Sequence, residues 1–197
     1  MKFNKHKTVY NVLKIVIIAC LIGFFAIFSV RIIQKKFIYP LSYCDQIIEF
    51  SDKYNLDYAF VFAVVKCESS FNKHAVSNKG AIGLMQITAS TGEYMAKLIN
   101  KQNYNLLNYK DNLEIGCAYL RYLYDKFKVL DTVIASYNAG EGNVNNWLKN
   151  KEYSKDGITL DKIPYKETEE YLIKIKKTLL KYQNLYGKLL DKQQKNR

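Results

Sequence analysis

Glu68 is the residue in this sequence best placed for acid–base chemistry, because it stands at the end of an apolar run that begins at Phe60 and reaches Val65. A carboxyl group at the end of an apolar helix loses hydration, which disfavours its charged form and raises its pKa. A general acid that works near neutral pH needs a raised pKa, since it must hold its proton until the leaving group takes it. The alternative is a helix cap or a surface ion pair, which a single Glu after a helix also fits.

A glycine-punctuated segment, Gly80–Gln86, follows Glu68 along the chain. It is too rich in glycine for the interior of an ordinary helix, because glycine loses the most conformational freedom there. Its small residues would let a ligand lie against the backbone, and the side chain of Gln86 can both donate and accept hydrogen bonds. The segment therefore favours a loop that contacts a ligand.

Four blocks of sequence place these residues in a wider pattern: E-S-S-F-N at 68–72, A-V-S-N-K-G-A-I-G-L-M-Q-I at 75–87, A-S-Y-N-A-G at 135–140 and E-T-E-E-Y-L at 167–172. In this order, across roughly residues 43–185, they resemble the lytic transglycosylase domain of the soluble-transglycosylase type, which is related to goose-type lysozyme. The resemblance implies an enzyme that cleaves peptidoglycan glycan strands between N-acetylmuramic acid and N-acetylglucosamine and needs no cofactor. Two scattered histidines, His6 and His74, are too few for a metal cluster.

The resemblance also implies roles for single residues. Most glycoside hydrolases use two carboxylates, but one is enough when the C6 hydroxyl of muramic acid attacks its own anomeric carbon and forms a 1,6-anhydro ring. Glu68 would first protonate the glycosidic oxygen and then accept the proton of that hydroxyl. The implied substrate-binding positions are Ser77 near the acetamido group, Gly83, Met85 and Gln86 along the sugar groove, Tyr137 hydrogen-bonded to the acid, Asn138 facing the cleft, and Glu167 closing the far side of the site.

Two other functions stay open. A hydrolytic lysozyme would need a second acid or a held water, and Asp111 and Glu114 read equally well as a cap and a surface charge. A non-catalytic peptidoglycan-binding module would be marked by loss of the acid, and Glu68 is present.

The elements that must position these residues are predicted to be helices throughout, giving an all-α domain, which the resemblance implies is lysozyme-like. No segment alternates with the period of a strand over a strand's length. The run ending at Glu68 is apolar nearly all round, so its helix should be the central, buried one. Helices are predicted at about 41–54, 58–69 with Asp57 as N-cap, 88 or 90 to 99, 111–127, 132–139 capped by Asp131, 143–149 and 167–186.

A further apolar run, uncharged from Ile15 to Val30, lies near the N-terminus. With its flanks at 12–33 it reaches the length of about 20 residues that a membrane-crossing helix needs. A cleaved signal peptide has a shorter apolar region and a small-x-small cleavage pattern, so the run favours an uncleaved anchor. The expected organisation is a basic cytoplasmic segment at 1–11, a transmembrane anchor at 12–33, a linker at 34–40, the catalytic domain at 41–190 and a polar tail at 191–197.

The charge distribution points to a membrane rather than to nucleic acid. Residues 1–36 carry seven Lys and Arg and no acid, so +7 of the net charge of +12 lies beside the apolar run. Nucleic-acid binding would require a basic stripe on the folded domain. The expected partners are the membrane, crossed once, and glycan strands outside the cytoplasm, with cell-wall or secretion-machinery proteins left open. Cys44, Cys67 and Cys117 are an odd number outside the membrane, so they cannot all pair within one molecule, and Cys67 is best interpreted as a small buried apolar residue.

Overall fold

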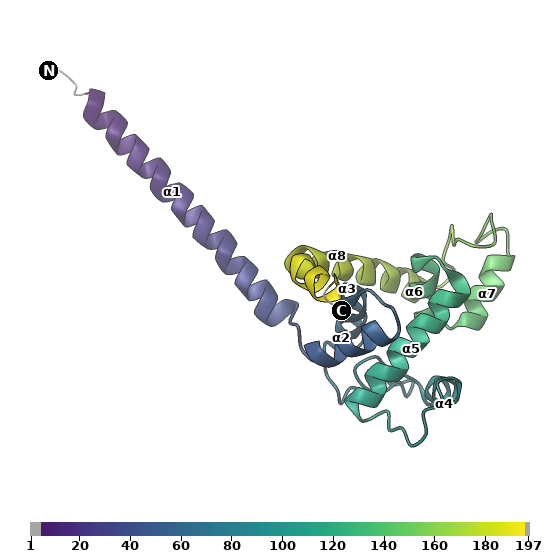
Figure 1. Cartoon of the computed structure of the whole chain (residues 1–197). Coiled ribbons are helices and arrows are strands. Elements are labelled where there is room, and N and C mark those ends of the chain that lie inside the picture. Colours follow the sequence, from purple (N-terminus) through teal and green to yellow (C-terminus); the bar gives the residue numbers. More distant parts are fainter. Residues whose placement is uncertain (1–4, 196–197) are drawn as a thin grey trace. The chain divides into compact units, whose positions relative to one another are not determined.

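The computed structural model describes residues 5–195 of the 197-residue chain and separates them between two compact units, Met1–Leu41 and Ser42–Arg197 (Figure 1). The start of the expected basic segment 1–11 and the end of the expected polar tail 191–197 lie outside the described residues.

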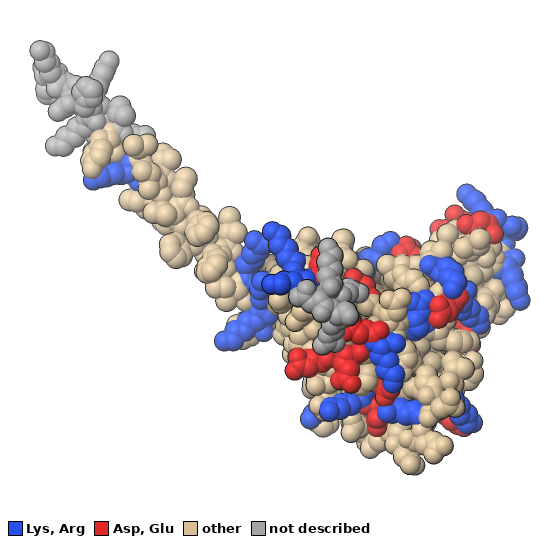
Figure 2. Space-filling view, viewed as in Figure 1, with Lys and Arg blue, Asp and Glu red and all other residues tan. Residues whose placement is uncertain are grey.

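The first unit consists of helix α1, Lys5–Ile33, which continues into a short π-helical segment, η1, Gln34–Ile38. Its large apolar side chains are exposed, and Figure 2 shows them as an almost uncharged stretch of the helix. Within the described residues, Leu13–Ile38 is the one helical stretch long and apolar enough to cross a membrane, with a mean hydropathy of 2.7. A signal sequence near an N-terminus shares these properties.

The second unit is built from helices, as the sequence predicts. The described residues contain no strand, only isolated bridges that join Val76 to Ile82 and Ile82 to Ile87. The helices are α2 Cys44–Lys53, α3 Tyr58–Ser69, α4 Ala89–Leu98, α5 Tyr109–Phe127, α6 Leu130–Ala139, α7 Glu141–Lys149 and α8 Lys166–Lys195.

Helix α3 is the buried centre of this unit and packs against α2 and α8. The Asp57 carboxylate accepts a hydrogen bond from the backbone N–H of Phe60 at 2.6 Å, which confirms the predicted N-cap. Midway along the helix, the ring of Phe62 stacks on Tyr182 of α8 with centroids 5.5 Å apart. The helix ends when Ser70 takes a left-handed conformation at φ 51°, directly after the turn that carries Glu68. The rigid, apolar helix therefore fixes where Glu68 emerges.

Several helix ends differ from the prediction: α2 begins at Cys44 rather than at about residue 41, and α7 begins at Glu141 rather than at residue 143. Helix α5 begins at Tyr109, because the side chain of Asn108 caps it by accepting from the N–H of Lys110 at 2.9 Å. Helix α6 begins at Leu130, so Asp131 lies inside its first turn and pairs with Lys176 of α8 at 2.7 Å rather than capping the helix.

The largest difference is the length of α8, which continues to Lys195, past the predicted end at Tyr186 and into the expected polar tail. Tyr186 and Leu190 are both buried, so the continued helix has an apolar face to pack.

Candidate active site

A cavity of about 400 Å³ opens at the end of α3, and most of the residues implied by the sequence blocks line it. They come from four parts of the chain: the last turn of α3, the loop between α3 and α4, the end of α6 and the start of α8. The cavity is lined by Glu68, Ser77, Asn78, Lys79, Ala81, Gln86, Thr88, Tyr137, Asn138 and Glu167.

Glu68 is half-buried at this cavity, and its carboxylate accepts a hydrogen bond from the hydroxyl of Tyr171. Burial raises the pKa of Glu68 to about 7, while the Tyr171 hydrogen bond and the positive charge of Lys174 act in the opposite direction. The net direction is the one predicted from the apolar run. A carboxyl with this pKa holds a proton at neutral pH and can also release it, which suits a general acid that later acts as a base.

The tyrosine that bonds Glu68 is not the one expected. The hydroxyl of Tyr137 donates instead to the backbone carbonyl of Met85 at 2.8 Å, so the expected Tyr137–Glu68 hydrogen bond is replaced by that of Tyr171. Tyr137 nevertheless lines the cavity, and burial followed by the charge of Glu68 raises its pKa well above the ordinary value. Tyr171 belongs to the block E-T-E-E-Y-L, so the sequence contains a signal for it, although the resemblance implied a role only for Glu167 in that block.

Gly83 and Met85 support the cavity from behind and are not among its lining residues. Gly83 has a left-handed φ of 77°, and a Cβ atom there would come within 2.4 Å of the side chain of Asn112. Asn112 holds the loop by accepting from the N–H of Met85 at 2.8 Å and donating to the carbonyl of Ile82 at 2.8 Å. Met85 is fully buried against Gly116 of α5. The expected groove contacts of Gly83 and Met85 are therefore replaced by a structural role in fixing the loop.

Ser77 and Gln86 stabilise the same loop and face the cavity. The hydroxyl of Ser77 accepts from the N–H of Ala81 at 3.0 Å. Gln86 has a left-handed backbone at φ 49°, and its side-chain amide donates to the carbonyls of Gly83 at 2.9 Å and Ala75 at 3.2 Å. These bonds hold the glutamine in a defined orientation at the cavity wall.

Asn138 and Glu167 connect the cavity to the start of α8. The hydroxyl of Thr168 donates to the side-chain oxygen of Asn138 at 2.7 Å, joining α6 to α8. Glu167 pairs with Lys79 at 3.2 Å, and both side chains are largely exposed, 70% and 80% respectively. An exposed pair of this kind contributes little to stability. The two residues therefore mark the open rim of the cavity.

The other acids considered from the sequence lie elsewhere. Glu114 is buried on α5 and pairs with Lys53 at 2.5 Å and with Lys101 at 2.6 Å, and Asp111 pairs with Lys101 at 2.9 Å. Neither Asp111 nor Glu114 lines the cavity. Among residues 5–195, wherever side chains are described, no group of three or more His, Cys, Asp or Glu side chains is arranged to hold a metal ion.

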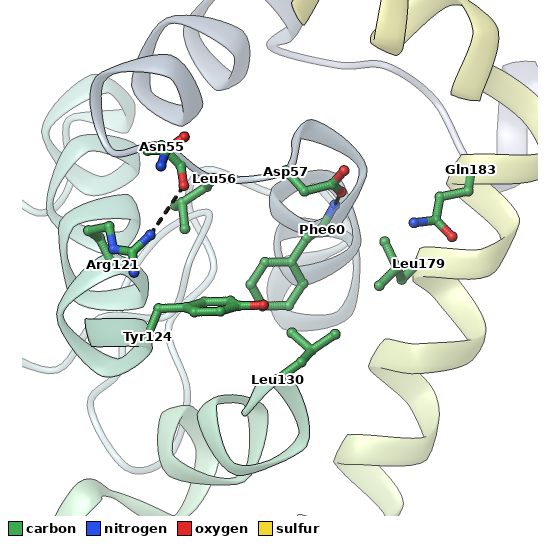
Figure 3. Close-up of a pocket in the computed structure, with 9 residues that line it drawn as sticks. All are labelled: Asn55, Leu56, Asp57, Phe60, Arg121, Tyr124, Leu130, Leu179 and Gln183. Atoms are coloured by element: carbon green, nitrogen blue, oxygen red, sulfur yellow. Dashed lines mark hydrogen bonds between the residues drawn. The ribbon is translucent and has the colours of Figure 1, made fainter. Parts of the chain in front are cut away.

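A second cavity of about 410 Å³ lies near the opposite end of α3, beside Asp57 and Phe60 (Figure 3). The guanidinium of Arg121 is tied there to the carbonyl of Asn55 at 3.3 Å, as the dashed line shows. None of the residues implied by the four blocks lines it. Size therefore does not distinguish the two cavities, whereas the chemistry of Glu68 does.

The chain is similar to known proteins over most of its second unit. Over 156 residues the chain is 31% identical to the soluble lytic murein transglycosylase of Escherichia coli K12, covering 75% of this chain and 23% of that protein. It is 35% identical over 115 residues to the membrane-bound lytic murein transglycosylase C of Photorhabdus laumondii, covering 52% of this chain and 32% of that one. The chain thus spans about a quarter to a third of the length of these relatives.

A solved structure and a family pattern also match the chain. The crystal structure of the 70 kDa soluble lytic transglycosylase of Escherichia coli is similar with a TM-score of 0.67 and 29% identity, covering 76% of this chain and 25% of that one. Residues 45–159, which include the end of α3, the glycine-punctuated loop and the end of α6, match the transglycosylase SLT domain. The chain belongs to the transglycosylase SLT domain family.

Proposed function

We propose that this chain is a membrane-anchored lytic transglycosylase that cleaves the β-1,4 bond between N-acetylmuramic acid and N-acetylglucosamine in peptidoglycan. The observation that carries the proposal is Glu68, a half-buried carboxyl with a pKa of about 7 at the wall of a polar cavity. Membership of the family and the activities named for its relatives supply the substrate class.

In the proposed reaction the protonated Glu68 donates its proton to the glycosidic oxygen as the bond from the anomeric carbon to that oxygen breaks. The C6 hydroxyl of the muramic acid forms the new bond to the anomeric carbon and passes its proton to the Glu68 carboxylate. The enzyme regains its starting protonation, and no water is consumed. Because the nucleophile is already part of the substrate, proximity supplies much of the rate.

The remaining residues hold the acid and the sugar. Tyr171 orients the Glu68 carboxyl through its hydrogen bond, which leaves the other oxygen to face the glycosidic bond. Ser77, Gln86 and Asn138 offer polar groups along the cavity to the acetamido and hydroxyl groups of the glycan, and Glu167 meets the strand at the rim. Glu167 is exposed and paired with Lys79, so it is poorly suited to activate a water as the second acid of a hydrolase.

The location follows from the first unit and from the substrate. The apolar Leu13–Ile38 stretch and the membrane-bound relatives favour membrane association. We place the helix across the membrane once, with the N-terminus in the cytoplasm, because a domain that cuts the cell wall must face outward. Organisation into a short basic segment, an anchor, a linker and a catalytic domain is part of the same proposal.

Mass spectrometry of fragments released from purified peptidoglycan tests the reaction. The full chain in detergent should release disaccharide-peptides that end in 1,6-anhydromuramic acid, lighter by one water than hydrolytic products and unreactive to borohydride. Borohydride-reactive ends would refute transglycosylation in favour of a lysozyme. Binding without any cleavage would support the non-catalytic module.

Fractionation tests the anchor. The full chain should stay with the membrane through a high-salt wash, because apolar burial rather than charge holds it. Removal of residues 1–36 should release a soluble and active second unit. Recovery of a mature chain that begins near residue 31 would replace the anchor by a cleaved signal peptide.

A further inference from the structure

The cavity at Glu68 continues into a smaller one of about 270 Å³. Gln86, Thr88, Tyr137 and Asn138 line both, so the two form one groove. Away from Glu68, the smaller cavity is lined by α4, by α5 and by the junction of α6 and α7, through Thr91, Tyr119, Ala139 and Gly140 together with Ile87.

Just beyond these lining residues, the same three elements are bonded to one another. Tyr94 and Tyr122 follow Thr91 and Tyr119 by three residues, which is nearly one helical turn, and Glu141 follows Gly140 directly. The hydroxyl of Tyr94 donates to that of Tyr122 at 3.5 Å, and the hydroxyl of Tyr122 donates to the Glu141 carboxylate at 3.0 Å. We call Tyr94, Tyr122 and Glu141 the tyrosine–glutamate bridge.

The bridge is reinforced by charge and by ring contacts. Lys126 pairs with Glu141 at 2.6 Å, and both side chains are only about one-third exposed, 34% and 35% respectively. The rings of Tyr94 and Tyr122 meet edge to face with centroids 5.7 Å apart, a favourable geometry for aromatic pairs. The hydrogen bond from Tyr94 is the leading cause of a raised pKa at Tyr122, followed by burial and by Glu141, so its hydroxyl keeps its proton at neutral pH.

Aromatic rings also run without a break from the catalytic cavity to the bridge. Tyr137 and Tyr119 have centroids 5.4 Å apart, and Tyr119 and Tyr122 stack at 6.3 Å. Tyrosine rings present apolar faces with polar rims, which suits a sugar ring whose faces carry C–H groups and whose edge carries hydroxyls. The smaller cavity therefore has the lining of a saccharide subsite.

We propose that the tyrosine–glutamate bridge closes the groove at the end away from Glu68, so that a glycan strand extends only about one sugar unit past the catalytic cavity on that side. The inference rests on the proposed function for its substrate class. A volume of about 270 Å³ is below the roughly 300–1,000 Å³ of sites for drug-sized ligands, which agrees with a single sugar ring. The bridge joins α4 to α7 through α5, and a longer strand could pass only if these hydrogen bonds opened. It would make the enzyme select bonds near a strand end.

Binding of N-acetylglucosamine oligomers of increasing length tests the bridge independently of cleavage. In the full chain carrying Glu68→Gln, affinity should stop rising once the oligomer reaches the bridge. Adding Tyr94→Ala removes the exposed ring from α4, and affinity should then rise several-fold with each further sugar. Tyr122→Phe, which removes one hydroxyl from the same bridge, should give a smaller change in the same direction.

The control is Tyr124→Phe, which removes a hydroxyl from the same helix at the separate cavity of Figure 3 and should leave the length dependence unchanged. An identical length dependence with and without Tyr94→Ala would overturn the inference, as would failure of every oligomer to bind. If the unaltered enzyme nevertheless releases 1,6-anhydro products, the proposed function stands although the bridge inference fails. If Tyr94→Ala shifts the length dependence but the unaltered enzyme releases no 1,6-anhydro products, the bridge inference stands although the proposed function fails.

Discussion

Glu68 and Glu114 are both carboxyl side chains on helices of the same folded unit, and burial acts on both to raise the pKa. Around Glu114, the hydrogen bonds and charges of Lys101 and Lys53 outweigh burial and leave its pKa lowered. Around Glu68, the hydrogen bond of Tyr171 and the charge of Lys174 are too weak to outweigh burial, and the pKa rises to about 7.

The difference shows that burial by itself does not decide the direction in which the pKa of a carboxyl shifts. Among the described residues, Glu114 forms ion pairs with two lysines within 2.6 Å, whereas Glu68 is bonded by a neutral hydroxyl. A buried ion pair fixes the charge of a carboxylate, and a tyrosine hydroxyl orients a carboxyl without fixing its protonation state. The region around Glu114 therefore ties α2, α5 and the loop before α5 together, and the region around Glu68 keeps a transferable proton.

Glu68→Gln should have the largest effect, because glutamine keeps the size of the side chain but cannot donate a proton to the leaving oxygen. Cleavage should fall by about 10²–10⁴-fold, the range for loss of a general acid. The measurement is the rate of fragment release from purified peptidoglycan, with binding of glycan retained. Full activity of Glu68→Gln would show that Glu68 is not the general acid, and Glu68 and Glu114 would then not differ in function.

Tyr171→Phe should reduce cleavage by roughly ten- to a hundredfold, a loss of about 1.4–2.7 kcal/mol of transition-state stabilisation. The hydroxyl lowers the pKa of Glu68, so its removal should also move the alkaline limb of the pH–rate profile to higher pH. Tyr137→Phe is the matched comparison, since it loses a bond to the Met85 carbonyl and should leave that limb in place. If the alkaline limb moved further in Tyr137→Phe than in Tyr171→Phe, Tyr137 rather than Tyr171 would be the tyrosine that bonds Glu68.

The pH dependence of the unaltered enzyme follows from the raised pKa. Since Glu68 must be protonated to act as an acid, kcat/KM should stay level up to about pH 7 and then fall about tenfold per pH unit. An ordinary pKa near 4.5 would place the fall in the acid range instead. Initial rates on soluble glycan fragments at constant ionic strength measure this limb, and its absence near neutral pH would contradict the environment described for Glu68.

Glu114→Gln should have the smallest effect on cleavage, leaving the rate per folded molecule unchanged. It should lower the free energy of unfolding by about 1–3 kcal/mol at neutral pH, because two lysines lose their carboxylate. Since the pKa of Glu114 is lowered in the folded state, its stabilisation is present above the ordinary value of 4.5 and is lost as pH falls through the lowered pKa. Urea titrations of variant and parent should therefore converge in acid, and a difference independent of pH would exclude the ion pairs as its cause.

The sequence predicted well where structure is local. The apolar run and its cap gave the bounds of α3, since a cap involves residues only three positions apart. It was less accurate for α8, whose last turns form because Tyr186 and Leu190 find partners in the folded unit. Many lysines obscure the apolar periodicity at the end of α8, so its apolar face is recognised only from the packing of the helix.

By itself the sequence determined the helical class and the position of Glu68 at the end of an apolar helix, because both depend on neighbours along the chain. It also predicted the raised pKa of Glu68, although the shift arises from burial in the folded unit. The tertiary structure decided which tyrosine reaches the acid. Tyr171 lies 103 residues from Glu68, and the hydroxyl of Tyr137 is directed to a carbonyl 52 residues away. It also decided that Gly83 and Met85 support the groove from behind, because α5 packs against that loop through Asn112 and Gly116. Contacts between α3, α5, α6 and α8 fix these choices, and spacing along the chain does not encode them.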